Sequence, residues 1–187
     1  MIDLDKCVEG LQSENDKIRC KNFKILLPIS ERSPELLYSF WDIFVDLLKR
    51  DNVSSRYYAI FLISNLVKID KQNKFDKIFN RFYDLLNSES PVVSPNVAGV
   101  SGKVVNAKPY LETKITNRLL NVDKTSKCRY LDLMKSYVIL AFDEYFDKVK
   151  NRKKILEFVK CQLNSSSPKT KKVAKEFLKK RFPEEKF

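Results

Sequence analysis

Asp143 and Glu144 form a pair of adjacent carboxylates, flanked by Phe142, Tyr145 and Phe146. Apolar surroundings raise the pKa of a carboxyl group, which suits general acid–base catalysis. On a helix, however, adjacent side chains point about 100° apart and do not converge on one atom. We therefore interpret the pair as part of a solvated helix face. The sequence contains no histidine, which excludes histidine-based catalytic triads and histidine metal ligands.

A second segment with possible chemistry is 97–105, which invites comparison with a phosphate-binding loop. Such a loop needs a glycine where this chain has Val97, and a serine or threonine where it has Val104. No strand is expected before the segment either. We interpret its two glycines, Gly99 and Gly102, as places where two helices approach closely, rather than as a nucleotide site.

Four cysteines are spread along the chain, with no two of them close enough to form a CxxC pair. Zinc sites need such close pairs of ligands, so the spacing does not favour a metal site. We expect four reduced, mostly buried thiols in an intracellular protein. The four are Cys7, Cys20, Cys128 and Cys161.

The start of the chain lacks the basic and apolar regions of a signal peptide. The longest nearly apolar run, 57–67, is far below the roughly 20 residues that cross a bilayer. We therefore expect a cytoplasmic protein in a reducing environment, without membrane association. The residue types predict no catalytic, cofactor-binding or metal-binding group and no cofactor, so we do not expect an enzyme.

The net charge of +12 is concentrated at one end, because region 151–187 carries two thirds of the excess. Lys171, Lys175 and Lys179 follow one another at helical spacing, with Lys172 beside them and no acidic residue expected to neutralise them. These four lysines are a candidate anion-binding face. The other interpretation is that they form the polar outer face that a terminal helical repeat needs for solubility.

Strict alternation of apolar and polar residues is nearly absent, and apolar residues recur at spacings of three and four. This pattern predicts an all-α protein of about ten helices. The helices form pairs that recur with a period of about 38 residues, which is typical of a helical solenoid. A leucine near the end of the first helix of each pair marks the period: Leu11, Leu48, Leu86, Leu120 and Leu163. The provisional repeats, in one domain spanning 1–187, are 1–34, 35–73, 74–109, 110–150 and 151–187.

Segment 44–59 combines leucines that end at Leu48 with an acid at Asp51, then Arg56 and Ala59 early in the next helix. This segment is similar to the HEAT pattern, and the chain resembles a HEAT or armadillo-like repeat protein over nearly its whole length. The resemblance implies a right-handed α-α superhelix of about five helix pairs. A bundle of antiparallel helices without superhelical stacking is the alternative.

In the HEAT family, the acid in the turn and the arginine of the second helix tend to form a ladder between adjacent repeats. The resemblance assigns this structural role to Asp51 and Arg56, and also to Glu14 and Arg19. Ser94 occupies the arginine position of the third repeat, which departs from the pattern.

The resemblance and the missing catalytic groups together predict a non-enzymatic scaffold or adaptor that binds a protein partner. We expect a monomer or a weak dimer. Binding of nucleic acid through the basic final repeat is the alternative. A HEAT-like family of DNA glycosylases is a third candidate, but this chain lacks the paired tryptophans expected to cradle a damaged base.

Overall fold

The computed structural model describes residues 2–184. This part of the chain contains eleven α-helices and no strand, which confirms the prediction of an all-α protein. The boundaries of the provisional repeats fall between α-helices, and two of them lie within the 3₁₀ turns Pro34–Leu36 and Pro109–Leu111. The helices are α1 (Leu4–Gly10), α2 (Asp16–Arg32), α3 (Trp41–Lys49), α4 (Val53–Leu66), α5 (Lys74–Asp84), α6 (Val93–Ala107), α7 (Glu112–Leu120), α8 (Val122–Thr125), α9 (Leu131–Tyr145), α10 (Arg152–Cys161) and α11 (Pro168–Arg181).

Polar residues in the turns cap the helices that follow them. Asn15 accepts a hydrogen bond from the Lys17 amide at 2.9 Å at the start of α2, and Asn52 accepts one from the Ser55 amide at 3.1 Å at the start of α4. Such caps satisfy backbone N–H groups that have no partner within the helix. Pro168 occupies the first position of α11, where its fixed φ suits a helix and its missing N–H costs nothing.

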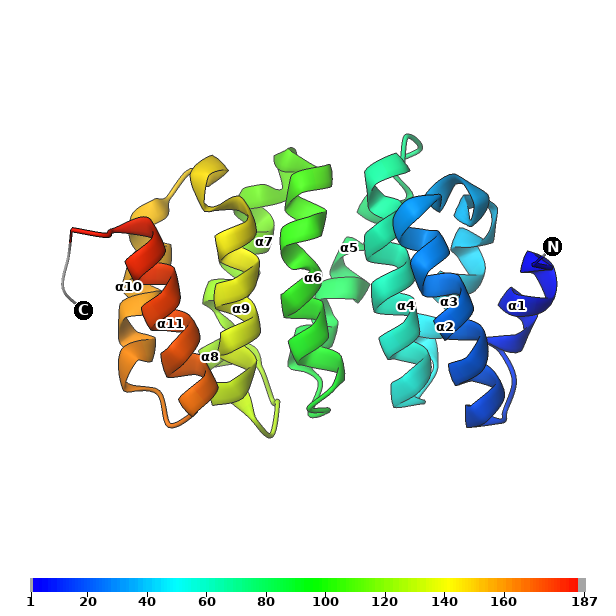
Figure 1. The fold of residues 1–187 in the computed structure, drawn as a ribbon, viewed down its shortest axis with the longest axis horizontal. Coiled ribbons are helices and arrows are strands. Elements are labelled where there is room, and N and C mark those ends of the chain that lie inside the picture. Colours follow the sequence, from blue (N-terminus) through cyan, green and yellow to red (C-terminus); the bar gives the residue numbers. More distant parts are fainter. Residues whose placement is uncertain (1, 185–187) are drawn as a thin grey trace. The chain divides into compact units, whose positions relative to one another are not determined.

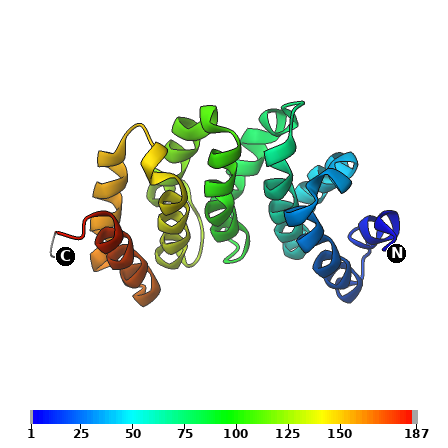
Figure 2. The same cartoon turned by 45° about the horizontal axis from the view of Figure 1, so that its top comes forward.

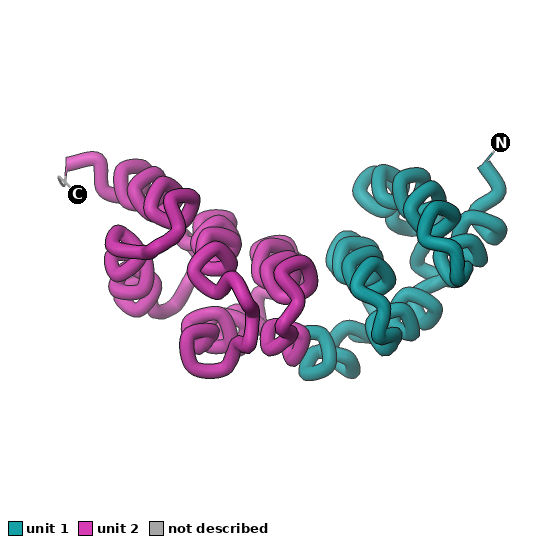
Figure 3. Tube along the Cα trace, turned by 90° about the horizontal axis from the view of Figure 1, so that it is seen from below, with its two compact units in different colours: residues 1–82 teal, residues 83–187 magenta. Residues whose placement is uncertain are grey.

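The chain divides into two compact units, Met1–Phe82 and Tyr83–Phe187, which Figure 3 distinguishes by colour. The division falls in the last turn of α5, so no linker separates the units. The single domain expected from the sequence stays a prediction. We describe each unit by itself.

Within unit 1, α2 and α4 pack side by side, and α3 packs against α4. Trp41, Phe44 and Leu48 of α3 are buried beneath α4 and form much of the core of this unit. Trp41, the lone tryptophan, is 1% exposed and belongs to this core.

Within unit 2, α6, α9 and α11 lie side by side in one layer, and α7, α8 and α10 lie behind them (Figures 1 and 2). Within each unit we call the later helix of each pair a second-layer helix, which gives α2 and α4 in unit 1 and α6, α9 and α11 in unit 2. The first-layer helices are α3 in unit 1 and α7 and α10 in unit 2. No helix within residues 2–184 has both the length and the apolar character needed to cross a membrane.

Candidate functional site

The adjacent carboxylates of α9 point to different neighbours. Asp143 accepts hydrogen bonds from Lys180 at 2.7 Å and from Arg181 at 2.9 Å, both on α11. Glu144 instead lies against Gly102 of α6, on the other flank of α9. The two carboxylates therefore diverge, as predicted from their spacing, and do not form a catalytic pair.

The two carboxyl groups also differ in their electrostatic surroundings. Burial alone would raise the pKa of Asp143, but the hydrogen bonds and charges of Lys180 and Arg181 outweigh it and hold that pKa below its usual value. Burial raises the pKa of Glu144, despite the opposing charge of Lys103. Asp143 is thus kept ionised in an ion-pair network that joins α9 to α11.

The glycine-containing segment 97–105 is continuous helix within α6. A Cβ atom at Gly99 would lie 3.3 Å from Cδ1 of Tyr137, and one at Gly102 would lie 2.7 Å from Cβ of Glu144. Both glycines therefore allow α6 and α9 to approach closely, which confirms the interpretation drawn from the sequence.

The four cysteines are free. Cys7 and Cys128 are buried, Cys20 is half-buried and Cys161 is exposed, so the expectation of buried thiols is wrong for Cys161. Within residues 2–184, no three cysteine or acidic side chains gather closely enough to hold a metal ion.

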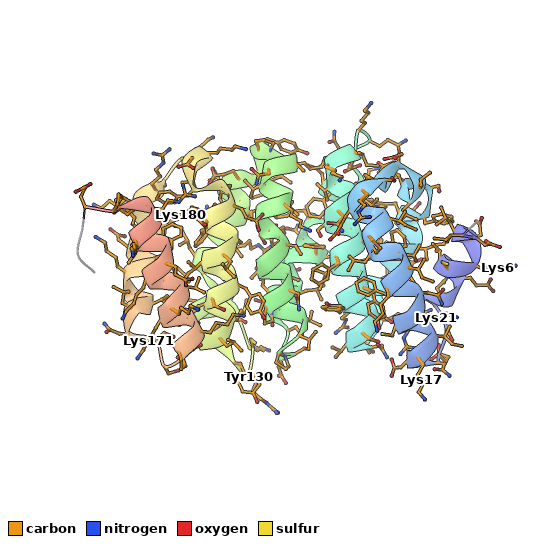
Figure 4. The ribbon with its side chains drawn as sticks, in the orientation of Figure 1. Lys6, Lys17, Lys21, Tyr130, Lys171 and Lys180 are labelled. Atoms are coloured by element: carbon orange, nitrogen blue, oxygen red, sulfur yellow. The ribbon has the colours of Figure 1, made fainter. Side chains whose placement is uncertain are left out.

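The candidate anion-binding lysines lie on α11. The side of α11 that faces α9 is marked by Thr170, which donates a hydrogen bond to the Asp132 carbonyl at 2.5 Å, and by Arg181. Residues on a helix are about 100° apart, so Lys171, Lys175 and Lys179 occupy the opposite side. Figure 4 shows Lys171 turned away from α9.

These lysines differ in their pairing. All four are exposed. Lys172 lies 3.9 Å from Glu176, one turn later, so the expectation that no acid neutralises the lysines is wrong at this position. Lys171, Lys175 and Lys179 make no ion pair with any described residue.

Asp51 and Arg56 are joined within one turn, where the arginine donates to the Asp51 carboxylate at 3.0 Å. Links from this turn to the preceding helix pair come from neighbouring residues. Arg50 donates to the Gln12 carbonyl at 3.0 Å, and Ser54 donates to the Asp16 carboxylate at 3.1 Å. The ladder role of Asp51 and Arg56 stays a prediction.

Arg19 is buried at the start of α2 and donates to the Asp16 carboxylate and to the Ser13 carbonyl at 2.5 Å. Glu14, the partner named by the resemblance, is exposed and takes part in no ion pair within the described chain. Asp16 pairs with Arg19 instead of Glu14, although the comparison of repeats did not point to Asp16.

The outward side of α9 carries an apolar stripe, which we call the α9 stripe: Leu133, Tyr137 and Leu140. Leu133 is 37% exposed and Leu140 is 45% exposed, and Tyr137 between them is half-buried. The opposite side of α9 is buried, with Met134, Val138 and Phe142 in the core. The stripe ends at Glu144, which is exposed one turn after Leu140 on the same side of α9.

The neighbours of the α9 stripe hold it in place. Tyr137 lies against Gly99 of α6 on one side, and the ammonium of Lys169 on α11 lies 4.2 Å from its ring centre on the other. A pocket of about 100 Å³ opens beside Leu140, between α9 and α11. Its lining is mixed: besides Leu140 it consists of apolar Ile139, Val173 and Phe177 and of charged Asp143, Glu176 and Lys180. This is room for a small apolar group.

Unit 1 carries a similar feature, which we call the α4 stripe: Val53, Tyr57 and Phe61 on the outward side of α4. Val53 is 42% exposed, and Tyr57 and Phe61 are half-buried. Tyr58, one residue on from Tyr57, is buried against α2, so the tyrosine pair divides between surface and core.

The first-layer helices present polar outer faces instead. On α3 the exposed residues are Asp42, Asp46 and Lys49, and on α10 they include Lys153 and Glu157. The contrast between layers was not predicted. For α4, the sequence did carry an indication of this contrast: run 57–67 is too uniformly apolar for a helix with only one buried face.

No protein-family model matches the sequence, and no curated protein sequence matches it significantly. One solved structure, titled as the crystal structure of an engineered protein from a structural genomics consortium, aligns with a TM-score of 0.44. The two chains share 14% sequence identity, and the alignment covers 98% of this chain and 100% of the other.

Proposed function

We propose that the chain is a non-enzymatic interaction module, a scaffold or adaptor that binds a protein partner on the outward side of its second-layer helices. The α9 stripe carries this proposal. Soluble proteins tend to cover contiguous apolar surface, and exposed leucines beside a pocket partly lined by apolar side chains favour an apolar segment of another protein. Within unit 2, the polar outer face of α10 leaves the outward side of α9 for this contact.

We further propose that the helix pairs stack as HEAT or armadillo-like repeats in a right-handed superhelix. Hydrogen bonds between residues one period apart support this. Ser126 donates to the Leu86 carbonyl at 2.7 Å, and Thr170 donates to the Asp132 carbonyl at 2.5 Å, over separations of 40 and 38 residues. Each bond fixes a turn of one helix pair onto the pair before it, as a stacked repeat requires.

The position of the lysines on α11 supports their interpretation as a polar end of the stack. Lys171, Lys175 and Lys179 lie opposite the side that packs on α9, where a terminal repeat needs charge to remain soluble. Binding of nucleic acid through these lysines is therefore the weaker candidate, and a salt titration described below tests it.

A peptide selection tests the proposed function. A library of random peptides displayed on phage is selected against the intact chain, and the enriched peptides are titrated against two variants. Leu133→Ser/Leu140→Ser removes most of the apolar area of the α9 stripe. Leu36→Ser is the matched control, because Leu36 is 53% exposed in a 3₁₀ turn outside the second layer.

We expect the selected peptides to contain apolar anchors and to bind the control variant like the parent. Affinity for the double variant should fall at least tenfold, since each buried leucine contributes about 1.5 kcal/mol or more. Equal binding to the parent and the double variant, or an equal loss in the control, would contradict the proposal.

A further inference from the structure

The outward side of α2 is basic. Lys17, Lys21 and Lys24 follow one another at spacings of four and three, so they share one side of the helix. All three are exposed and make no ion pair with any residue that the structure describes. Figure 4 shows Lys17 and Lys21 projecting from α2. Three like charges on one helix side repel one another, and a negative partner would relieve this repulsion.

The contacts of α2 define which side is outward. Phe23 stacks on Tyr58 of α4 with ring centres 4.3 Å apart, which marks the side toward α4. Arg19 and Leu26 are buried and mark the side toward the core. Lys24 is about 100° around the helix from Phe23 and is the lysine nearest the contact with α4, whereas Lys17 and Lys21 lie about 120° and 160° from Phe23, on the solvent side of α2.

Across this contact lies the α4 stripe. The rings of Tyr57 and Phe61 are 4.9 Å apart, and both contact Phe23, at 5.6 and 6.5 Å between centres. An aromatic patch on α4 therefore adjoins the row of lysines on α2. We call the lysine row and the two half-buried rings the basic–aromatic face.

Acidic residues do little to neutralise this face. The Asp16 carboxylate is held by Arg19 and Ser54. Glu31 is exposed, but it lies about two helical turns beyond Lys24, at the end of α2. Lys68, in the 3₁₀ turn Val67–Ile69 that follows α4, donates to the Glu31 carbonyl at 2.6 Å and adds a positive charge near that end.

We infer that the basic–aromatic face of unit 1 binds an acidic amphipathic helix of a protein partner. The apolar residues of that helix would cover Tyr57 and Phe61, and its carboxylates would pair with Lys17, Lys21 and Lys24. Two neighbouring helices with an apolar centre and a charged border match the way amphipathic helices dock. This inference rests on the proposed function and names the partner chemistry for unit 1.

The rings favour a peptide over single-stranded nucleic acid. Bases stack on open aromatic faces. Here Tyr57 and Phe61 are tilted by 57° against each other, and Tyr57 meets Phe23 edge to face at 66°. They form a small apolar surface rather than separate stacking platforms. The row also contains lysines alone, whose flexible ammonium groups suit exposed carboxylates.

The test uses a designed, fluorescently labelled peptide of about four helical turns, with leucines at helical spacing on one side and glutamates on the other. Its binding to the intact chain is measured by anisotropy. Two control peptides have the same leucines with lysine in place of glutamate, or the same composition in scrambled order. The variant Lys17→Gln/Lys21→Gln/Lys24→Gln is compared with Lys171→Gln/Lys175→Gln/Lys179→Gln. The α11 variant is the matched control, because it also removes three unpaired lysines from one side of a helix.

We expect the acidic peptide to bind the parent and the α11 variant equally, and to lose about tenfold in affinity on the α2 variant, as three exposed ion pairs would give. The scrambled and basic peptides should bind far more weakly. Equal loss in both variants, equal binding of the scrambled peptide, displacement by oligo-dT or no binding to the parent would overturn the inference. None of these results concerns the α9 stripe, so they are distinguishable from failure of the proposed function.

Discussion

Arg181 should be among the most important charged residues for the stability of unit 2. Its guanidinium donates to the Asp143 carboxylate at 2.9 Å, to the Asp143 carbonyl at 2.7 Å and to the Asp147 carboxylate at 2.7 Å. It also lies 5.2 Å from the centre of the Phe146 ring. The Arg181 side chain is only 14% exposed, so its contacts with Asp143 are largely shielded from water, whereas the Asp147 carboxylate is exposed. Arg181→Ala removes all of them together.

The expected loss follows from these contacts. A hydrogen bond to a charged group contributes about 1.5–3 kcal/mol when it is shielded, and a cation over an aromatic ring adds about 0.5–1 kcal/mol. Asp143 keeps its bond to Lys180 at 2.7 Å, so the variant does not leave a buried charge without a partner. Arg181→Ala should therefore lower the free energy of unfolding by about 2–3 kcal/mol.

Arg56→Ala is the matched control. Arg56 donates one hydrogen bond to Asp51, whose side chain is fully exposed. Exposed ion pairs contribute at most about 1 kcal/mol, so this variant should lose less than that. Both proteins are unfolded in urea at pH 7 and followed by circular dichroism. In thermal melts the expected shifts are roughly 4–10 °C for Arg181→Ala and below about 4 °C for Arg56→Ala.

The pH dependence of the unfolding free energy is a second test of the contact between Arg181 and Asp143. The pKa of Asp143 is lowered in the folded state, so its pairing stabilises the fold above the unfolded pKa of about 3.9. That contribution is lost as the pH falls through the lower, folded pKa. The difference between the parent and Arg181→Ala should thus shrink below about pH 4. A loss no larger than that of Arg56→Ala, or a difference independent of pH, would refute this reasoning.

The remaining predictions concern α6 and α11. Gly102→Ala should destabilise the protein by roughly 1–2 kcal/mol in urea unfolding, because the clash with Glu144 exceeds the gain of about 1 kcal/mol in helix propensity. Gly99→Ala, which meets only the ring edge of Tyr137, should be within about 0.5 kcal/mol of the parent; the same loss at both positions would contradict the α6–α9 packing. Random-sequence DNA should bind more weakly than about 100 μM at low salt. If it binds tightly, with a log–log salt slope near −2.7 that Lys171→Gln/Lys175→Gln/Lys179→Gln abolishes, those lysines are a nucleic-acid site.

Apolar periodicity was sufficient to predict an all-α protein of about ten helices, and residues 2–184 contain eleven. The turn around Asp51 and Asn52 was recognised as a break, and Asn52 caps α4 there. The close approach at Gly99 and Gly102 also followed from the sequence, because glycine inside a helix carries a cost that packing must offset.

The ion pairs were harder to predict, because they depend on which side of each helix meets its neighbour. Arg181 and Asp143 are 38 residues apart, which is the length of one period. Their contact could therefore have been predicted by pairing equivalent positions of adjacent repeats. Arg19 forms its ion pair with Asp16 and not with Glu14, and the reason is local. Asp16 lies three residues away on the same helix side, where its carboxylate meets the guanidinium.

The candidate binding surfaces could be recognised only from the structure. The α9 stripe and the α4 stripe consist of ordinary core-type residues, and only the burial of the opposite side shows that Leu140 and Phe61 face outward. The lysine row of α2 was overlooked because the charge excess of region 151–187 dominated the sequence.

The central claim is that a protein partner contacts the second-layer helices. The most direct measurement places a photo-crosslinking amino acid at Leu140 or Tyr57 in the second layer, or at exposed Lys153 on α10 as the control, and irradiates living cells that produce each variant. We predict that Leu140 and Tyr57 crosslink to a discrete protein and that Lys153 does not. Crosslinking that is equal at all three positions, or directed to nucleic acid, would contradict the claim.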